Sequence, residues 1–279
     1  MITFSSLGHH GRLGNQLFQL GLLMSINFKC NYDIVLPKDL FKRKHHGQAC
    51  LLNYFKLPTV TFSDILTTNK TYNEKIPFKY DPEVFKVEDN TNFHGHFENI
   101  NYIKEIREVL QKEYTIEQSI ENKITNLLNK HNNPVASLHI RRGDNADGTN
   151  PTTSSLNDTN KDSVFQKYYK QALKEIPSNS VIYLFTGGSR TGCNKDDYNW
   201  CKKVFDYDNR IIFAENLNTI ETFCFISKCD YNIMSFVSTF SWWGSFLNKN
   251  DNIIVPKQFN PVQKNWETKD IYLDNWLNL

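Results

Sequence analysis

The sequence predicts an α/β protein made of two halves, each with a parallel sheet, and three observations lead to this prediction. The chain has 279 residues, of which 39% are hydrophobic and 14% aromatic, enough to form a sizeable core. Short apolar runs of strand length alternate with segments of helical spacing, a pattern typical of a parallel sheet covered by helices. The stretch HNNP at 131–134 interrupts this alternation, so we expect a domain boundary near residue 132.

The elements of the first half follow from the spacing of its apolar residues. Asn15 stands just before the first helical segment, in a position suited to a helix cap. The remainder of 38–92 is expected to be irregular. Strands are expected at 2–7, at 33–37 and within 92–103, where the last strand runs into a helix start. Helical segments are expected at 16–28, around 39–43 and within 100–130.

The second half alternates more regularly. A polar stretch rich in Asn, Thr, Ser and Asp at 145–162 separates its first strand from its first helix. Strands are expected at 135–140, 180–187, 210–214, 231–235 and 252–256. Helices are expected at 164–176, 196–205, 219–229 and 242–248. Two halves of this kind predict twin Rossmann-like domains, 1–132 and 133–279.

Charge and cysteine usage narrow the class of protein. With 32 basic and 30 acidic residues the net charge is only +2, so no global field draws the chain to nucleic acid or to a membrane, and any anion site must be local. The start of the chain lacks a signal-peptide pattern, and no apolar window reaches the length of a membrane span. The six cysteines form no CxxC pair, which favours free thiols in a reducing compartment. A cytoplasmic protein is therefore expected.

Common catalytic and metal signatures are absent or weak. The glycines of GHHGRLG do not have GxGxxG spacing, no P-loop occurs, and GGSRT departs from GxSxG at its last position. DYD at 206–208 matches the loose DxD pattern of metal-using sugar transferases, but its best strand follows it. HGH at 94–96 could present two imidazoles, yet no third ligand has a matching spacing. We expect no metal, with these histidines structural or lining a substrate site.

Three polar motifs of the second half follow predicted strands or open a helix. They are HIRRGD at 139–144, TGGSRTGCNKDD at 186–197 and STFSWWG at 238–244. Ligands of open parallel sheets gather at the carboxyl ends of the strands, so we expect these motifs to converge on one site. The last motif is typical of a helix cap followed by two buried tryptophans. The N–H groups at such a helix start can also bind a phosphate.

The two arginines of HIRRGD repel each other unless an anion lies nearby. Side chains alternate along a strand, so His139 and Arg141 should share one face, and Arg142 and Asp144 the other. One of the two arginines, aimed at the helix start of 239–245, would then form a two-sided clamp on a diphosphate with that helix start. The simpler alternative is a surface ion pair between Arg142 and Asp144.

Five segments together resemble the alpha-1,2-fucosyltransferases of glycosyltransferase family 11, in order and across nearly the whole chain. HIRRGD alone is also similar to alpha-1,6- and protein O-fucosyltransferases. The five segments are GRLGNQLFQ at 11–19, GHFENINYI at 95–103, HIRRGD at 139–144, YYKQAL at 168–173 and STFSWWGSFL at 238–247.

The resemblance implies a GT-B fold, in which two Rossmann-like domains face each other across a cleft. It implies an acceptor-side domain at 1–132 and a GDP-fucose-binding domain at 133–279, whose last helix packs back on the first domain. The implied reaction moves L-fucose from GDP-β-L-fucose to the 2-hydroxyl of a terminal galactose in an oligosaccharide, with inversion and without metal or cofactor. Rival classes are a transferase for another GDP-sugar or another fucosyl linkage, and a non-catalytic glycan-binding protein.

Residue roles carry over position by position from the resemblance. Arg141 resembles the catalytic arginine that holds the donor's β-phosphate and stabilises the leaving group. The resemblance assigns further donor-binding roles to His139, Arg142, Asp144, Glu221, Ser238, Thr239, Ser241, Asn15 and Gln16. No base is assigned, and a late proton transfer to phosphate would need none. Acceptor-side candidates are His96, Glu98 and Asp81.

The chain also departs from the family pattern at three places. The acidic pair Asp196 and Asp197 comes only after GGSRTG, Val237 stands where asparagine is usual, and Thr222 stands where aspartate is usual, beside Glu221. Because of these departures, the resemblance does not assign the residues that contact the guanine.

Overall fold

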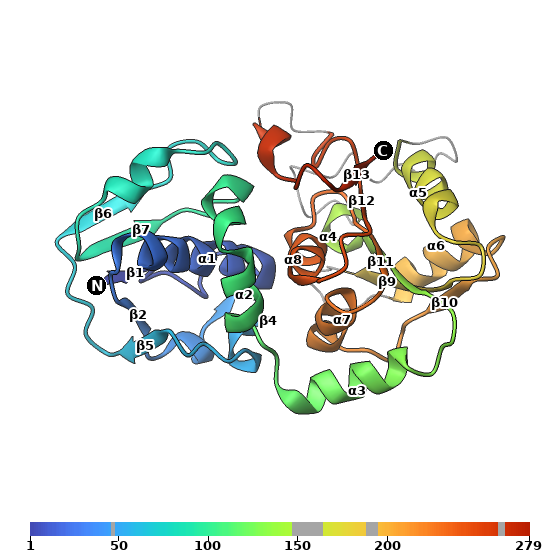
Figure 1. Cartoon of the computed structure of the whole chain (residues 1–279), viewed down its shortest axis with the longest axis horizontal. Coiled ribbons are helices and arrows are strands. Elements are labelled where there is room, and N and C mark those ends of the chain that lie inside the picture. Colours follow the sequence, from blue (N-terminus) through green and yellow to red (C-terminus); the bar gives the residue numbers. More distant parts are fainter. Residues whose placement is uncertain (46–47, 147–163, 188–194, 262–265) are drawn as a thin grey trace. The chain divides into compact units, whose positions relative to one another are not determined.

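The computed structural model describes residues 1–45, 48–146, 164–187, 195–261 and 266–279, which form two compact units (Figure 1). The first unit comprises Met1–Glu117 and Trp266–Leu273, and the second comprises Gln118–Asn265 and Asp274–Leu279. The first unit therefore ends ahead of the predicted boundary near residue 132. The reason is helix α3 (Gln118–Leu128), which buries Ile124 and packs on a helix of the second unit, α7 (Thr219–Ile226).

The first unit is built on a five-stranded sheet in the order β5-β2-β1-β7-β6, with every pairing parallel. Two of these strands, β5 and β6, lie in the stretch that the sequence predicted to be irregular, so that prediction was wrong. Both are four-residue edge strands with mostly exposed side chains, and they lack the apolar alternation that reveals a strand. The strands are β1 (Ile2–Thr3), β2 (Ile34–Pro37), β5 (Val60–Ser63), β6 (Lys70–Asn73) and β7 (Thr91–His94), and a small antiparallel pair is formed by β3 (Lys44–His45) and β4 (Gln48–Ala49).

Helix α1 (Leu13–Cys30) forms the centre of the first unit, and every residue from Gln16 to Ile26 is buried. It begins three residues earlier than predicted. Arg12 is the N-cap residue and makes no side-chain cap, so the prediction that Asn15 caps the helix is wrong. The other helical elements are α2 (Arg107–Glu113) and the 3-10 turns η1 (Leu40–Lys42), η2 (Leu52–Tyr54), η3 (Pro82–Lys86), η4 (Ile100–Tyr102), η5 (Lys104–Ile106) and η7 (Thr268–Asp270).

The second unit holds a six-stranded, fully parallel sheet in the order β10-β9-β8-β11-β12-β13. Counted within the unit this order is 3-2-1-4-5-6, that of a Rossmann fold, so the strand order reverses between β8 and β11. Five predicted strands are confirmed, whereas the exposed two-residue edge strand β13 was missed. The strands are β8 (Val135–Arg141), β9 (Val181–Gly187), β10 (Ile211–Phe213), β11 (Tyr231–Ile233), β12 (Ile253–Val255) and β13 (Leu277–Asn278).

Helices cover this sheet and supply most of its core. In α8 (Thr239–Leu247) both tryptophans are fully buried, and the ring of Trp242 stacks on Phe246 at a centroid distance of 4.8 Å. The remaining helices are the short α4 (Gly143–Ala146), α5 (Val164–Glu175) and α6 (Lys195–Phe205). The predicted α/β class with parallel sheets is thus confirmed.

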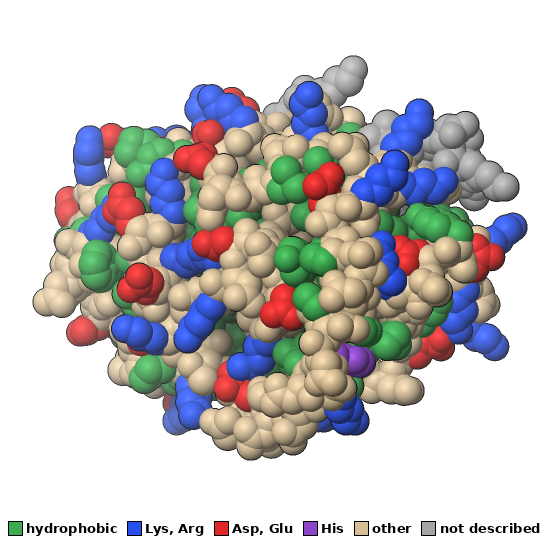
Figure 2. Space-filling model, turned by 45° about the vertical axis from the view of Figure 1, so that its right-hand side comes forward, with side chains coloured by type: hydrophobic (Ala, Val, Ile, Leu, Met, Phe, Trp, Pro, Cys, Tyr) green, Lys and Arg blue, Asp and Glu red, His purple; other side chains and the backbone are tan. Residues whose placement is uncertain are grey.

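The distribution of surface charges and the state of the cysteines agree with what the composition predicts. Lysine, arginine and acidic side chains are interspersed over the face in Figure 2. No helix in the described part of the chain is long and apolar enough to cross a membrane. The prediction of free thiols is confirmed for the five cysteines that the structure describes, and Cys193 lies outside those residues.

Candidate active site

Two of the predicted motifs meet at the point where the strand order of the second sheet reverses. Arg141 is the last residue of β8, and Ser238 precedes α8 just after the neighbouring strand β11. The backbone N–H of Arg141 donates to Ser235 Oγ at 2.8 Å, which ties the two strand ends together. Ligands of doubly wound sheets bind at this reversal, outside the carboxyl ends of the strands.

The guanidinium of Arg141 is held in place but only partly satisfied. Its Nη1 donates to the carbonyl of Val237. Its Nη2 lies 3.3 Å from both carboxylate oxygens of Asp144, longer than the 2.7–2.9 Å typical of charge-assisted hydrogen bonds. Its Nε is buried and has no hydrogen-bond partner among the described residues. Arg141 therefore retains bonding capacity for an anion.

The prediction that Asp144 shares the face of Arg142 is wrong, and so is the alternative that these two residues form an ion pair. Strand β8 ends at Arg141, and Gly143, with φ +40°, turns the chain into α4. The alternation of a strand stops at this turn, so Asp144 joins the side of Arg141 instead.

Arg142 has partners that the sequence did not reveal. Its Nε donates to Asp197 at 3.2 Å, and its guanidinium lies over the ring of Trp200, 4.0 Å from the centroid. Asp197 also accepts the backbone N–H of Gly143 at 3.1 Å. Both partners lie on α6, one turn apart, more than fifty residues along the chain. The two arginines thus serve different partners, as the strand geometry predicted.

His139 lies inside the core, on the strand that carries Arg141. It is only 8% exposed, and its ring packs 5.6 Å from that of Phe240. Burial, followed by the positive charge of Arg141, lowers the pKa of His139 to about 3. The imidazole is therefore neutral at physiological pH and adds no positive charge to the site.

The serines before and within α8 shape the start of the helix. Ser238 is the N-cap and accepts the N–H of Ser241 at 3.2 Å, and Ser241 Oγ lies 3.4 Å from the carbonyl of Ser238. Both are buried, while Thr239 is half-buried. Because the hydroxyls are used locally, the N–H groups and dipole of α8 are its means of binding an anion.

Val237 immediately precedes this cap and has φ +47°. A β-branched residue is a genuine outlier in the left-handed region. The conformation is fixed from two sides, because the N–H of Val237 donates to the carbonyl of Phe259 at 2.8 Å and its own carbonyl accepts from Arg141. The backbone strain thus helps to orient Arg141.

In the first unit the GNQ residues brace a loop. Asn15 Nδ2 donates to Glu98 Oε1. Gln16 is buried, and its Nε2 donates to the carbonyl of Gly11 at 2.9 Å. Glu98 and His96 follow β7, so Asn15 and these two candidates all lie in segments that follow the carboxyl ends of parallel strands.

Asp81 has a structural position. Its carboxylate accepts from Tyr72 at 2.6 Å, from Lys75 at 2.8 Å and from the N–H of Glu83 at 3.1 Å, where it caps η3. The hydrogen bond from Lys75, followed by that from Tyr72, lowers the pKa of Asp81. A carboxylate bound in this way is a poor proton acceptor.

A model of the family described as Glycosyl transferase family 11 matches residues 62–279 of this chain. The chain belongs to glycosyltransferase family 11.

Two Escherichia coli relatives support this membership. The "O-antigen biosynthesis glycosyltransferase WbnK" is 25% identical over 250 residues, which cover 82% of this chain and 75% of the relative. An "Alpha-1,2-colitosyltransferase" is 28% identical over 274 residues, which cover 86% of each.

Solved fucosyltransferases share the fold of this family 11 chain. POFUT1 in complex with GDP has a TM-score of 0.56 and 11% identity, covering 90% of this chain and 96% of that chain. Fucosyltransferase NodZ from Bradyrhizobium has a TM-score of 0.56 and 12% identity, covering 88% and 93%. A NodZ alpha-1,6-fucosyltransferase crystal soaked with GDP-fucose gives a TM-score of 0.54 at 13% identity, covering 88% and 92%. The predicted GT-B class is thereby confirmed.

Glu221, a predicted donor contact of the family 11 site, has its carboxylate engaged within the protein. It forms a capping box with Asn218 at the start of α7 and an ion pair with Lys123 at 2.6 Å. Burial raises its pKa, but the hydrogen bonds from Lys123 and from the backbone of Asn218, together with the charge of Lys123, outweigh this effect and the pKa is lowered. Residues 188–194 and most of the polar stretch at 145–162 lie outside the described residues.

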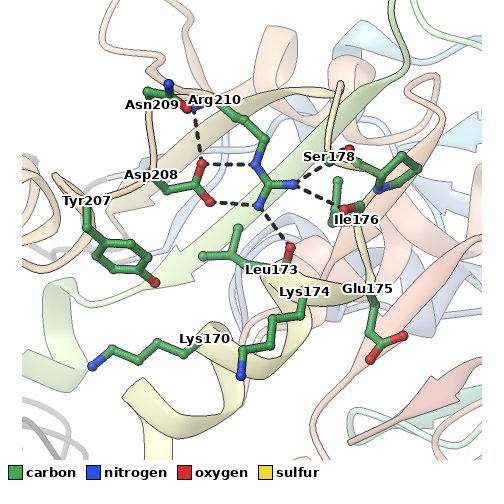
Figure 3. A pocket seen from close by; sticks show the side chains of 11 residues that line it. Lys170, Leu173, Lys174, Glu175, Ile176, Ser178, Tyr207, Asp208, Asn209 and Arg210 are labelled. Carbon is green, nitrogen blue, oxygen red and sulfur yellow. Dashed lines mark hydrogen bonds and ion pairs between the residues drawn. The ribbon is translucent and has the colours of Figure 1, made fainter.

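A groove of this family 11 chain lies at the opposite edge of the second sheet, where β9 and β10 begin (Figure 3). Arg210 forms its floor. The guanidinium donates to both oxygens of Asp208, at 2.9 and 2.7 Å, and to the carbonyls of Leu173, Ile176 and Pro177 at 2.9–3.2 Å. All five N–H groups of Arg210 are thus used to join the end of α5 to the start of β10.

Proposed function

We propose that this family 11 enzyme transfers L-fucose from GDP-β-L-fucose to the 2-hydroxyl of a terminal galactose in an oligosaccharide, with inversion and without a metal. The observation that carries the proposal is the partly satisfied Arg141 beside the start of α8, at the reversal point of a Rossmann sheet. Family membership supports the reaction class, and the solved neighbours in complex with GDP or soaked with GDP-fucose support the donor.

Charge development explains how this geometry would catalyse transfer. The bond between the anomeric carbon and the β-phosphate oxygen breaks, which leaves an oxocarbenium-like sugar and a diphosphate that gains negative charge. The acceptor oxygen forms the new bond from the opposite face, so the configuration inverts. Arg141 and the N–H groups of α8 bind the diphosphate most tightly when its charge is fully developed, and this lowers the barrier.

Arg142 and Asp144 support Arg141 in different ways in this proposal. Asp144 orients the guanidinium of Arg141, and Arg142 fixes the turn at Gly143 through Asp197. His139 provides a neutral, buried surface near the nucleoside. The acceptor would bind at the carboxyl edge of the first sheet, where Glu98 and His96 lie.

A second candidate donor is favoured by a specific relative. The alpha-1,2-colitosyltransferase shares 28% identity with this chain, and colitose is L-fucose without its 3-hydroxyl. Transfer of that sugar from its GDP form would use the same diphosphate contacts. The two candidates differ only in whether the site hydrogen-bonds the 3-hydroxyl, a contact that can supply strong discrimination.

The decisive experiment incubates the purified chain with GDP-fucose, GDP-colitose or GDP-mannose and a panel of galactosides, followed by NMR linkage analysis of the products. We expect an α-1,2-fucosyl galactoside, formed equally well in EDTA. Exclusive use of another sugar, or another linkage, would contradict the proposal. Calorimetry with GDP provides the comparison with a glycan-binding protein, which should not bind it. We also propose that the protein acts in the cytoplasm, and the free thiols support this.

A further inference from the structure

The two strands on either side of the reversal point stop pairing before β8 reaches Arg141. Strands β8 and β11 are paired only as far as Leu138 and Ile233. Strand β8 then continues to Arg141 along its other neighbour, β9. Beyond Leu138 the strand ladder therefore no longer fixes the distance between β8 and the segment that leads from β11 into α8, and this distance needs another restraint.

Ser235 supplies that restraint. Its Oγ accepts the backbone N–H of Arg141 at 2.8 Å, and its own backbone N–H donates to Ser241 Oγ at 3.4 Å. Ser241 lies in the first turn of α8, and both serines are buried. Arg141 and the N–H groups at the start of α8 are the two halves of the proposed diphosphate clamp. A single buried residue is thus bonded to both halves.

A tyrosine of α5 holds the hydroxyl of Ser235 in turn. Tyr169 is buried, and its hydroxyl lies 3.1 Å from Ser235 Oγ, within hydrogen-bond distance. Its ring packs against Phe205 and Phe236, with centroids 6.2 Å from each. Burial raises the pKa of Tyr169, and the hydrogen bond with Ser235 opposes this only in part. The phenol therefore stays protonated and keeps this bond across the physiological pH range.

The preceding residue of the same helix offers a matched comparison. Tyr168 is also buried, and its hydroxyl donates to the carbonyls of Met234 and Ile254 at 2.9 and 3.0 Å. These bonds fasten α5 to the backbone that follows β11 and to β12. Two buried hydroxyls of one helix thus differ in their partners, because Tyr169 bonds to the side chain that holds Arg141 and Tyr168 bonds to main-chain carbonyls.

We propose that Ser235 is a positioning residue that sets the distance between the two halves of the diphosphate clamp, and that Tyr169 fixes its hydroxyl. This inference rests on the proposed function. Donors stabilise a developing charge best when they are held in place beforehand, because they need not reorganise during the reaction. Loss of the Ser235 hydroxyl would leave the backbone N–H of Arg141 without its acceptor, and the end of β8 could then shift away from α8.

The test measures the binding of GDP and GMP by calorimetry, since the two nucleotides differ only in the β-phosphate that the clamp would hold. We expect the wild type to bind GDP more tightly than GMP. Ser235→Ala should lower the ratio of the two affinities by about 10-fold. Tyr169→Phe, which removes a single oxygen, should lower it by about 3-fold. Tyr168→Phe removes an equivalent oxygen and should leave the ratio unchanged.

This ratio separates positioning from a purely structural role. A variant that is only destabilised has a smaller folded fraction, which weakens the apparent binding of both nucleotides alike and leaves their ratio intact. An unchanged ratio in Ser235→Ala would overturn the inference, as would an equal fall in Tyr168→Phe and Tyr169→Phe. Should Ser235→Ala not fold, Tyr169→Phe decides in the same way.

Failure of the proposed function has a different signature. A wild-type protein that binds GDP no more tightly than GMP would contradict the diphosphate clamp itself. A wild type that prefers GDP, together with variants that keep this preference, would leave the clamp in place and remove Ser235 and Tyr169 from it.

Discussion

The two edges of the second sheet each present a half-buried arginine, and the two arginines differ in how fully they are bonded. Arg210, at the amino edge, uses all five N–H groups on Asp208 and three carbonyls (Figure 3). Arg141, at the carboxyl edge, makes two 3.3 Å contacts with Asp144 and keeps a buried Nε for which the described residues offer no partner. Both side chains are 18% exposed, so exposure does not distinguish them.

The difference indicates how a structural arginine can be told from a functional one. A buried donor without a partner costs free energy in the absence of a ligand, so its retention needs a compensating benefit. Arg210 needs none, because its bonds hold α5 and β10 together. Arg141 has that benefit if an anion binds beside it, as the position at the strand reversal indicates. The comparison can be tested by making the same substitution at both edges.

The largest effect on activity is expected at the carboxyl edge. Arg141→Ala should lower turnover by about 100-fold or more, as loss of a preorganised oxyanion donor does, because the charge on the departing diphosphate loses its main partner. The free energy of unfolding should change little, since the substitution also removes a poorly satisfied donor. Kinetics with GDP-fucose and urea unfolding measure the two quantities. Near-normal turnover would exclude Arg141 from catalysis.

The opposite pattern is expected at the amino edge. Arg210→Ala should lower the free energy of unfolding by about 2 kcal/mol or more, because Asp208 and three carbonyls lose their donor together. Turnover of the folded fraction should stay at the wild-type value, since the groove lies at the far end of the strands from Arg141. Loss of turnover without loss of stability would show that the groove takes part in the reaction.

Arg142 should fall between these extremes. Its contacts with Asp197 and Trp200 fix the turn at Gly143, so Arg142→Ala should lower turnover by about 10-fold and the free energy of unfolding by about 1 kcal/mol. Asp197→Asn keeps an oxygen for one of the two donors and should have the smaller effect. If Arg142→Ala costs more turnover than Arg141→Ala, the roles of the two arginines are reversed.

The same contrast explains how far the sequence predicts the fold. Strands β8, β9, β11 and β12 are recognisable in the sequence, because a strand buried on both faces is a continuous apolar run. The edge strand β10 is also found, because its three residues are all apolar. The edge strands β5, β6 and β13 carry exposed polar side chains, and their pairing is decided by the neighbouring strand rather than by their own pattern. Periodicity therefore finds the central strands and misses the edge strands whose side chains are polar and exposed.

For the candidate site, the sequence predicted which strand ends meet but not which side chains pair. Arg141 and Ser238 come together because parallel topology brings the carboxyl ends of neighbouring strands to one edge. The partner of Arg142 is remote in sequence. Asp144 was misplaced because the alternation of a strand was extended through Gly143, where the backbone turns.

The smallest effect is expected at Val237. Its strained backbone lowers the stability of the fold but helps to orient Arg141. Asparagine tolerates φ +47° better than a β-branched residue does, so Val237→Asn should raise the free energy of unfolding by about 0.5–1 kcal/mol. Its carbonyl would still accept from Arg141, so turnover should remain near the wild-type value. Val237→Thr is the matched control, since it is polar but still β-branched and should give no such gain. Equal stabilisation by threonine would attribute the effect to polarity, and the backbone at Val237 would then not be under strain.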